Sequence, residues 1–166
     1  MFERFGDDAR RAVVIAQDEC RRLHHAKVRS AHLALGALAA GDPLPGAAAV
    51  PGLLAAALGE GDADADSGDG IPFAGSARRV IAAGLKRADA EHRPVVDHFD
   101  LLLAALDEPA VADLIADDVD LDALRQAAVD ARHATAPNGD AEILLLLRHI
   151  VARLDVIESR LDDRSR

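Results

Sequence analysis

Seven histidines and one cysteine are the side chains of this chain whose chemistry could include catalysis or metal binding. The histidines are His24, His25, His32, His92, His98, His133 and His149. Their spacing matches neither the His-Glu-x-x-His pattern of zinc hydrolases nor the Cys/His pairs of structural zinc sites. Cys20 falls on a predicted apolar helix face, where a thiol packs as an inert hydrophobe. We therefore expect no catalytic residue, metal or cofactor, and a small metal-dependent hydrolase is the least favoured alternative.

A run of alternating aspartates at residues 62–66 begins like a calcium-binding loop. However, Ser67 stands where that loop needs a glycine for its tight turn, and Phe73 stands where it needs a bidentate glutamate. The surrounding segment, residues 59–70, is acidic, rich in glycine and without an apolar face. This composition predicts a solvated, mobile linker.

Charge and composition exclude several classes of partner. The net charge of −10 argues against nucleic acid and against anionic membranes. A single cysteine allows no internal disulfide, which is typical of a reducing compartment. Charged residues interrupt the N-terminus, so we expect no signal peptide, and the apolar run at residues 143–147 is too short to span a bilayer. The sequence predicts a soluble, cytoplasmic protein.

The elements that must position these side chains are predicted to be helices, because the apolar half of the chain is mostly Ala, Leu and Val. Residues 7–24 show helical periodicity. Ser30 is a predicted N-cap for a second helix, and residues 53–58 form a short third one. Later in the chain, Ser76 is expected to cap a helix that runs to about residue 92.

The remaining predicted helices follow in the second half of the chain. Asp97 is expected to cap a helix that carries Leu102 and Leu103, and Pro109 to occupy the first turn of another. Asp120 is the predicted cap of the last helix before residue 134. The chain is thus predicted to be all-α.

The chain also repeats itself with a shift of 68 residues. The matched pairs are Phe5 and Phe73, Ala9 and Ala77, Arg10 and Arg78, Val13 and Ile81, His24 and His92, Val28 and Val96, Leu33 and Leu101, Leu35 and Leu103, and Leu38 and Leu106. The register survives a turn without a gap, which indicates two homologous helical units around one core. We place repeat one at residues 1–58 and repeat two at residues 71–134.

The starts of the repeats carry a family resemblance. The N-terminus reads Met-Phe-Glu-Arg-Phe, and the second repeat is introduced by Ile-Pro-Phe at residues 71–73. Over residues 1–134 the chain resembles the N-terminal domain of the ClpC-type AAA+ unfoldases in its actinobacterial form. The resemblance implies two pseudo-symmetric four-helix Clp-N repeats. No Gly-Lys-Ser/Thr phosphate loop is present, so we expect a standalone domain without ATPase activity.

The resemblance implies a phosphoarginine site in each repeat, built on a Gly-Thr-Glu-His motif whose glutamate engages the guanidinium. Here the motifs read Arg-Ser-Ala-His at residues 29–32 and Asp-His-Phe-Asp at residues 97–100. Ala31 and Phe99 replace the two glutamates, so the charge-assisted hydrogen bonds are lost. We expect phosphoarginine binding to be absent or very weak.

The resemblance also implies a surface at which two phenylalanines receive hydrophobic cyclic peptides of the cyclomarin type. Phe2 and Phe73 occupy the matching positions, and Arg10 and Arg78 are predicted to line the same face. The alternative is that both rings only close the core at the repeat starts. Phe5 is predicted to be a core residue.

Residues 135–166 lie beyond the resemblance. Their apolar residues repeat at heptad spacing over residues 140–163, at Ile143, Leu147, Ile150, Leu154, Ile157 and Leu161. We predict a C-terminal helix that self-associates as a coiled coil; the alternative is a helix that folds back on its own domain.

Together these features predict a non-catalytic peptide-binding protein that sequesters hydrophobic cyclic peptide antibiotics as a decoy for the ClpC unfoldase. The alternative is an adaptor or regulator of the Clp protease that binds its substrates or the unfoldase.

Overall fold

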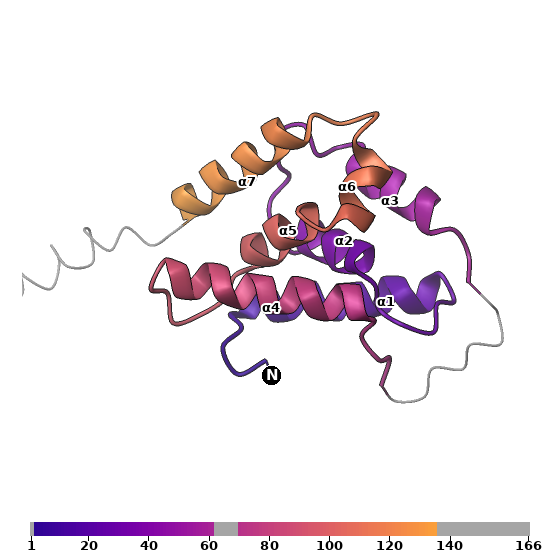
Figure 1. Cartoon of the computed structure of the whole chain (residues 1–166), viewed down its shortest axis with the longest axis horizontal. Coiled ribbons are helices and arrows are strands. Elements are labelled where there is room, and N and C mark those ends of the chain that lie inside the picture. The colour runs from indigo at the N-terminus through magenta and orange to yellow at the C-terminus, as the bar shows by residue number, and fades with distance from the viewer. Residues whose placement is uncertain (1, 62–69, 136–166) are drawn as a thin grey trace, which may run out of the picture. The chain divides into compact units, whose positions relative to one another are not determined.

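A computed structural model describes residues 2–61 and 70–135 of the chain. Seven helices lie in these ranges: α1 (Asp7–Arg22), α2 (Ser30–Ala40), α3 (Val50–Leu58), α4 (Gly75–Ala90), α5 (His98–Leu106), α6 (Pro109–Ile115) and α7 (Leu121–Thr135) (Figure 1). The described residues hold no strand, only two isolated β-bridges. The all-α prediction is therefore confirmed. None of these helices is long and apolar enough to cross a membrane.

The duplication is visible in the backbone. Helices α1 and α4 are each 16 residues long, and both α4 and α5 start 68 residues after their counterparts α1 and α2. His24 and His92, just beyond α1 and α4, share a left-handed conformation with φ of 53° and 54°. The second halves differ, since repeat one supplies three and repeat two supplies four of the described helices. Most of the predicted linker and the C-terminal helix lie outside the described residues.

The repeats interlock through two leading segments, residues 2–6 before α1 and residues 71–74 before α4. Each leading segment pairs with the loop between the first two helices of the other repeat. The pairs are Gly6 N with Val96 O at 2.9 Å, Val96 N with Arg4 O at 2.7 Å, Val28 N with Pro72 O at 2.9 Å, and Ala74 N with Val28 O at 2.8 Å. Because backbone groups must be satisfied when buried, each repeat completes the other.

Helices α2 and α5 form the centre of the core, with α1 and α4 on one side and α3 and α6 on the other (Figure 1). Every residue of α5 is buried, as expected of a helix that is apolar on nearly all sides. The contact between α1 and α2 is close because Gly36 has no side chain. A Cβ at this position would lie 2.0 Å from the carbonyl oxygen of Ala12.

Two of the predicted caps are wrong. Ser30 is the first residue of α2 and Arg29 precedes it as N-cap, while Ala74 is the N-cap of α4. The Ser76 hydroxyl instead accepts a hydrogen bond of 3.3 Å from the backbone N–H of Ser30, so it serves a helix of the other repeat. The predicted cap Asp97 is confirmed, since its carboxylate accepts a 2.8 Å hydrogen bond from the Asp100 backbone N–H.

Candidate functional site

Three phenylalanines meet where the two leading segments come together. The ring of Phe2 lies 5.0 Å from that of Phe5, edge to face, and 5.9 Å from that of Phe73. Phe5 is buried, whereas Phe2 and Phe73 are partly buried and pack on the edge of the core. The two predicted site residues are therefore neighbours. Each ring packs against the core and keeps an accessible part, and its role in binding a ligand stays a prediction.

An open groove of about 440 Å³ lies beside Phe73. Its lining residues are Lys27, Pro72, Phe73, Ala74, Gly75 and Arg78. Arg78 thus shares the groove with Phe73. Arg10 does not line it: this side chain occupies the equivalent place in repeat one, where it pairs with Asp7 at 3.4 Å.

Sequence reasoning missed Lys27 in this groove. The residue enters through the interlocked backbone, because Val28 pairs with Pro72 and Ala74 and so brings its neighbour next to Phe73. Only the pairing of the two repeats supplies this contact. The one available signal was that Lys27 is one of just two lysines in the chain.

The start of α5 shows what has replaced the second phosphoarginine motif. Phe99 is buried in the core, and Asp100 is fully buried. Asp100 receives a 3.0 Å hydrogen bond from the Asp97 backbone N–H and an ion pair from the Arg93 guanidinium. Hydrogen bonding to Asp100 raises the pKa of Arg93 above its ordinary value, although burial opposes it. The carboxylate of Asp100 is thus used internally and does not replace the missing glutamate.

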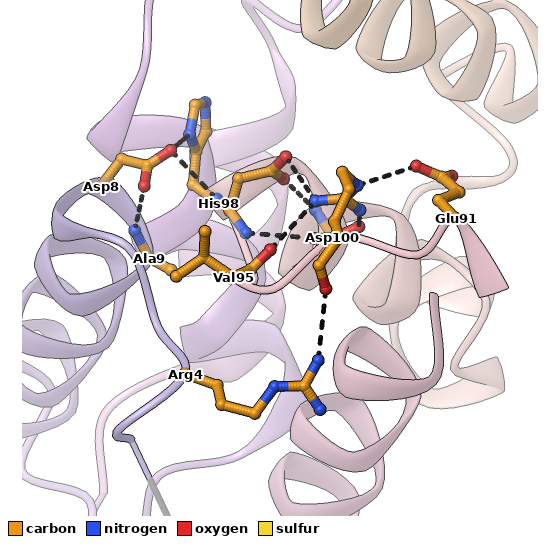
Figure 2. Close-up of polar contacts among 9 residues, drawn as sticks. Arg4, Asp8, Ala9, Glu91, Val95, His98 and Asp100 are labelled. Carbon is orange, nitrogen blue, oxygen red and sulfur yellow. Dashed lines mark hydrogen bonds and ion pairs between the residues drawn. The ribbon is translucent and has the colours of Figure 1, made fainter. Parts of the chain in front are cut away.

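Arg93 connects several carboxylates on this side of the domain. Besides Asp100, its guanidinium contacts Glu91 at 2.9 Å and Asp97 at 3.1 Å. The carbonyl oxygen of Arg93 accepts a hydrogen bond from Arg4 of the first leading segment. Figure 2 shows Arg4, Glu91 and Asp100 around this network. It fixes the loop between α4 and α5 against repeat one.

The start of α2 uses a different pair at the equivalent positions. Ala31 is buried, and His32 accepts a 2.9 Å hydrogen bond at Nδ1 from the Arg29 backbone N–H. Its Nε2 therefore carries the proton and donates to Nδ1 of His25 at 2.9 Å. Burial lowers the pKa of His32 to about 4 and also lowers the pKa of His25.

The remaining titratable groups of interest are also structural. Cys20 is buried, its thiol donates to the His25 carbonyl at 3.2 Å, and burial raises its pKa. A thiol held in this way is a poor nucleophile. No group of three or more His, Cys, Asp or Glu side chains within residues 2–61 and 70–135 is arranged to hold a metal ion.

Asp8 and His98 form an acid–imidazole pair between the repeats (Figure 2). The Asp8 carboxylate lies 2.6 Å from His98 Nδ1 and accepts a 2.8 Å hydrogen bond from the Ala9 N–H. Burial acts to raise the pKa of Asp8, but the hydrogen bonds from His98 and Ala9 outweigh it and lower the pKa. His98 Nε2 is buried beside Gly41 and bonds to no described group, so the pair has no nucleophile to activate.

No protein-family model matches this sequence. Solved structures share its fold. The N-terminal domain of the caseinolytic protease associated chaperone ClpD from Arabidopsis thaliana is 19% identical, with a TM-score of 0.63 over 79% of this chain and 96% of that one. The Hsp104 N-terminal domain from Candida albicans is 16% identical, with a TM-score of 0.65 over 78% and 92%. A structure from a malarial protein secretion system is 15% identical, with a TM-score of 0.65 over 80% and 97%.

These likenesses extend over nearly the full length of the matched chains and show a Clp N-domain-like fold. They bear out the fold part of the resemblance seen at the repeat starts. The actinobacterial, standalone part of that resemblance stays a prediction.

Proposed function

We propose that this chain is a non-catalytic peptide-binding protein of the Clp N-domain type, in the cytoplasm, and that its ligands bind on the Phe2–Phe73 surface. The observation that carries the proposal is the contact between two partly exposed phenylalanine rings beside an open groove. In a chain with four aromatic residues, two of them at an accessible edge are a candidate hot spot. The fold shared with chaperone N-terminal domains supports a binding role.

The ligand class that fits this surface is a hydrophobic peptide, including cyclic peptides of the cyclomarin type. Flat rings offer large apolar contacts and lose little side-chain entropy when a ligand covers them. Arg78 borders the same groove, and Arg10 lies exposed on the first turn of α1. We assign both arginines to the rim of the ligand surface and Phe2 and Phe73 to its centre.

The biological role that we propose is that of a standalone decoy, of actinobacterial type, for the ClpC unfoldase. A protein that binds a toxic peptide lowers the free concentration of that peptide and so protects the enzyme it targets. Phosphoarginine is not proposed as a ligand, because Ala31 and Phe99 are buried and apolar and Asp100 is already paired. The adaptor alternative stays a prediction, since the tail that it would use lies outside the described residues.

Calorimetric titration with a cyclomarin-type peptide tests the proposal. We expect binding by the full chain, and a loss of about tenfold in affinity for Phe2→Ala and for Phe73→Ala, since a hot-spot aromatic contributes about 1–2 kcal/mol. Leu114→Ala is the matched control, because Leu114 is an exposed apolar side chain on α6, outside the groove. Circular dichroism checks that each variant folds. Absence of binding by the unaltered chain would refute the decoy role.

A further inference from the structure

The groove beside Phe73 carries positive charge that the protein itself does not neutralise. Lys27 and Arg78 line it, and no carboxylate is among its lining residues. Within the described ranges, neither cation has an ion-pair partner. Most of the other described arginines do, in a chain whose net charge is −10. Two cations that line one groove without an ion-pair partner among the described residues, in such an acidic protein, mark a place for an external anion.

The helix that begins in the groove, α4, adds to the positive potential of Lys27 and Arg78. Gly75 is the first residue of α4, a 16-residue helix with no acidic residue in its first turn and no side-chain cap. Its first backbone N–H groups and the positive end of its dipole therefore face this side without an internal counter-charge. Helix α1, its counterpart, carries Asp7 and Asp8 in the same turn.

The pseudo-symmetry supplies an internal control for this difference. On the equivalent surface, at the start of α1, Val95 stands in place of Lys27, Asp7 in place of Gly75, and Phe5 in place of Phe73. Phe5 is 1% exposed, and Arg10, the counterpart of Arg78, pairs with Asp7. One half of the duplicated surface is thus closed and neutralised, while the other is open and cationic. Because the two surfaces are related by duplication and yet differ, the duplication alone does not explain the open, cationic groove beside Phe73.

We propose that the groove beside Phe73 binds the carboxyl-terminal residue of a peptide, with its apolar side chain against Phe73 and its α-carboxylate between Lys27 and Arg78. This inference rests on the proposed peptide-binding function and names its ligand class. A terminal residue places an apolar group and an anion on one Cα, which matches an apolar floor with cations at its rim. A volume of about 440 Å³ accommodates one or two such residues.

The test compares two peptides that differ only in this group: acetyl-Ala-Ala-Leu-Leu with a free carboxylate, and the same peptide as its C-terminal amide. Binding to the full chain is measured by calorimetry at low ionic strength. We expect the acid to bind about tenfold more tightly than the amide, since it meets two cations and a helix N-terminus. Lys27→Met and Arg78→Met should each reduce this preference about threefold, as exposed charge pairs do. Lys86→Met, an exposed lysine of α4 outside the groove, should leave it unchanged.

Each outcome separates this inference from the function it rests on. Equal binding of acid and amide, or a preference that Lys27→Met and Arg78→Met do not alter, would overturn the carboxylate inference and leave peptide binding standing. The same holds if the chain binds the cyclic peptide but neither linear one. An amide peptide with an internal aspartate that binds as well as the acid would overturn the specificity for a chain terminus. Failure of the acid, the amide and the cyclic peptide to bind would overturn both proposals.

Discussion

The hydrogen-bonded histidines of repeat one should make the domain sensitive to mild acid. From the Arg29 N–H through His32 to His25, both ring nitrogens of His32 and Nδ1 of His25 are used when both imidazoles are neutral. An added proton would place two N–H groups face to face, either at His32 Nδ1 or between the rings. His32 is fully buried, so water cannot relieve this conflict.

The magnitude follows from the pKa of His32, which burial lowers from 6.5 to about 4. Because the unfolded chain binds a proton more readily, the stabilising contribution is fully present above pH 6.5 and is lost as the pH falls towards 4. Between pH 7.5 and pH 5 the free energy of unfolding should fall by about 2 kcal/mol from His32 alone. The lowered pKa of His25 acts with the same sign, whereas the lowered pKa values of Asp8 and Glu108 act at more acidic pH.

The assay is urea unfolding followed by circular dichroism at pH 7.5, 6 and 5. Repeat two supplies the matched variant, because Arg93 and Asp100 occupy the positions equivalent to His25 and His32. The double variant His25→Arg, His32→Asp should lose about 2 kcal/mol of the pH dependence. The exposed His133→Asn is the control and should retain it. A double variant with unchanged pH dependence, or a His32 imidazole that titrates near 6.5 by NMR in the unaltered protein, would refute the reasoning.

Two further predictions concern the packing of the repeats. Gly36→Ala should lower the free energy of unfolding by about 2 kcal/mol or more, because the added Cβ would lie 2.0 Å from the Ala12 carbonyl oxygen. Gly52→Ala is the control: the space around its Cβ is open, so thermal melts should show a neutral or slightly stabilising effect. Arg93→Met should lower the free energy of unfolding by about 3 kcal/mol in urea unfolding, because it removes the guanidinium that forms an ion pair with the fully buried carboxylate of Asp100. A loss no greater than that of Arg21→Met, which breaks an exposed pair with Asp18, would contradict this role.

The repeat and its register could be predicted from the sequence because core positions recur at fixed spacing. Val28 and Val96 illustrate this, since each is a buried loop residue between two helices. The pairing of each leading segment with a loop of the other repeat could not be predicted, because backbone hydrogen bonds do not depend on side-chain type. The same pairing explains why Lys27 was missed and why the predicted cap at Ser76 was wrong, since the Ser76 hydroxyl accepts a hydrogen bond from Ser30 of the other repeat.

For the candidate site, too, some features could be predicted from the sequence and others could not. That Ala31 and Phe99 cannot act as carboxylate ligands could be predicted from residue type alone. Whether Phe2 was core or surface could not, because a partly buried ring has the same sequence signature as a buried one. The histidine pair His25 and His32 was missed, since its two members are seven residues apart and belong to a loop and a helix. The boundaries at residues 58, 70 and 134 and the coiled coil stay predictions.

The central claim is that ligands bind where the two repeat starts meet. A structure of the chain with a bound cyclomarin-type peptide tests it most directly. We predict contacts to the rings of Phe2 and Phe73, with Arg78 at the edge of the ligand. A peptide bound at the starts of α2 and α5, next to Ala31 and Phe99, would contradict the account.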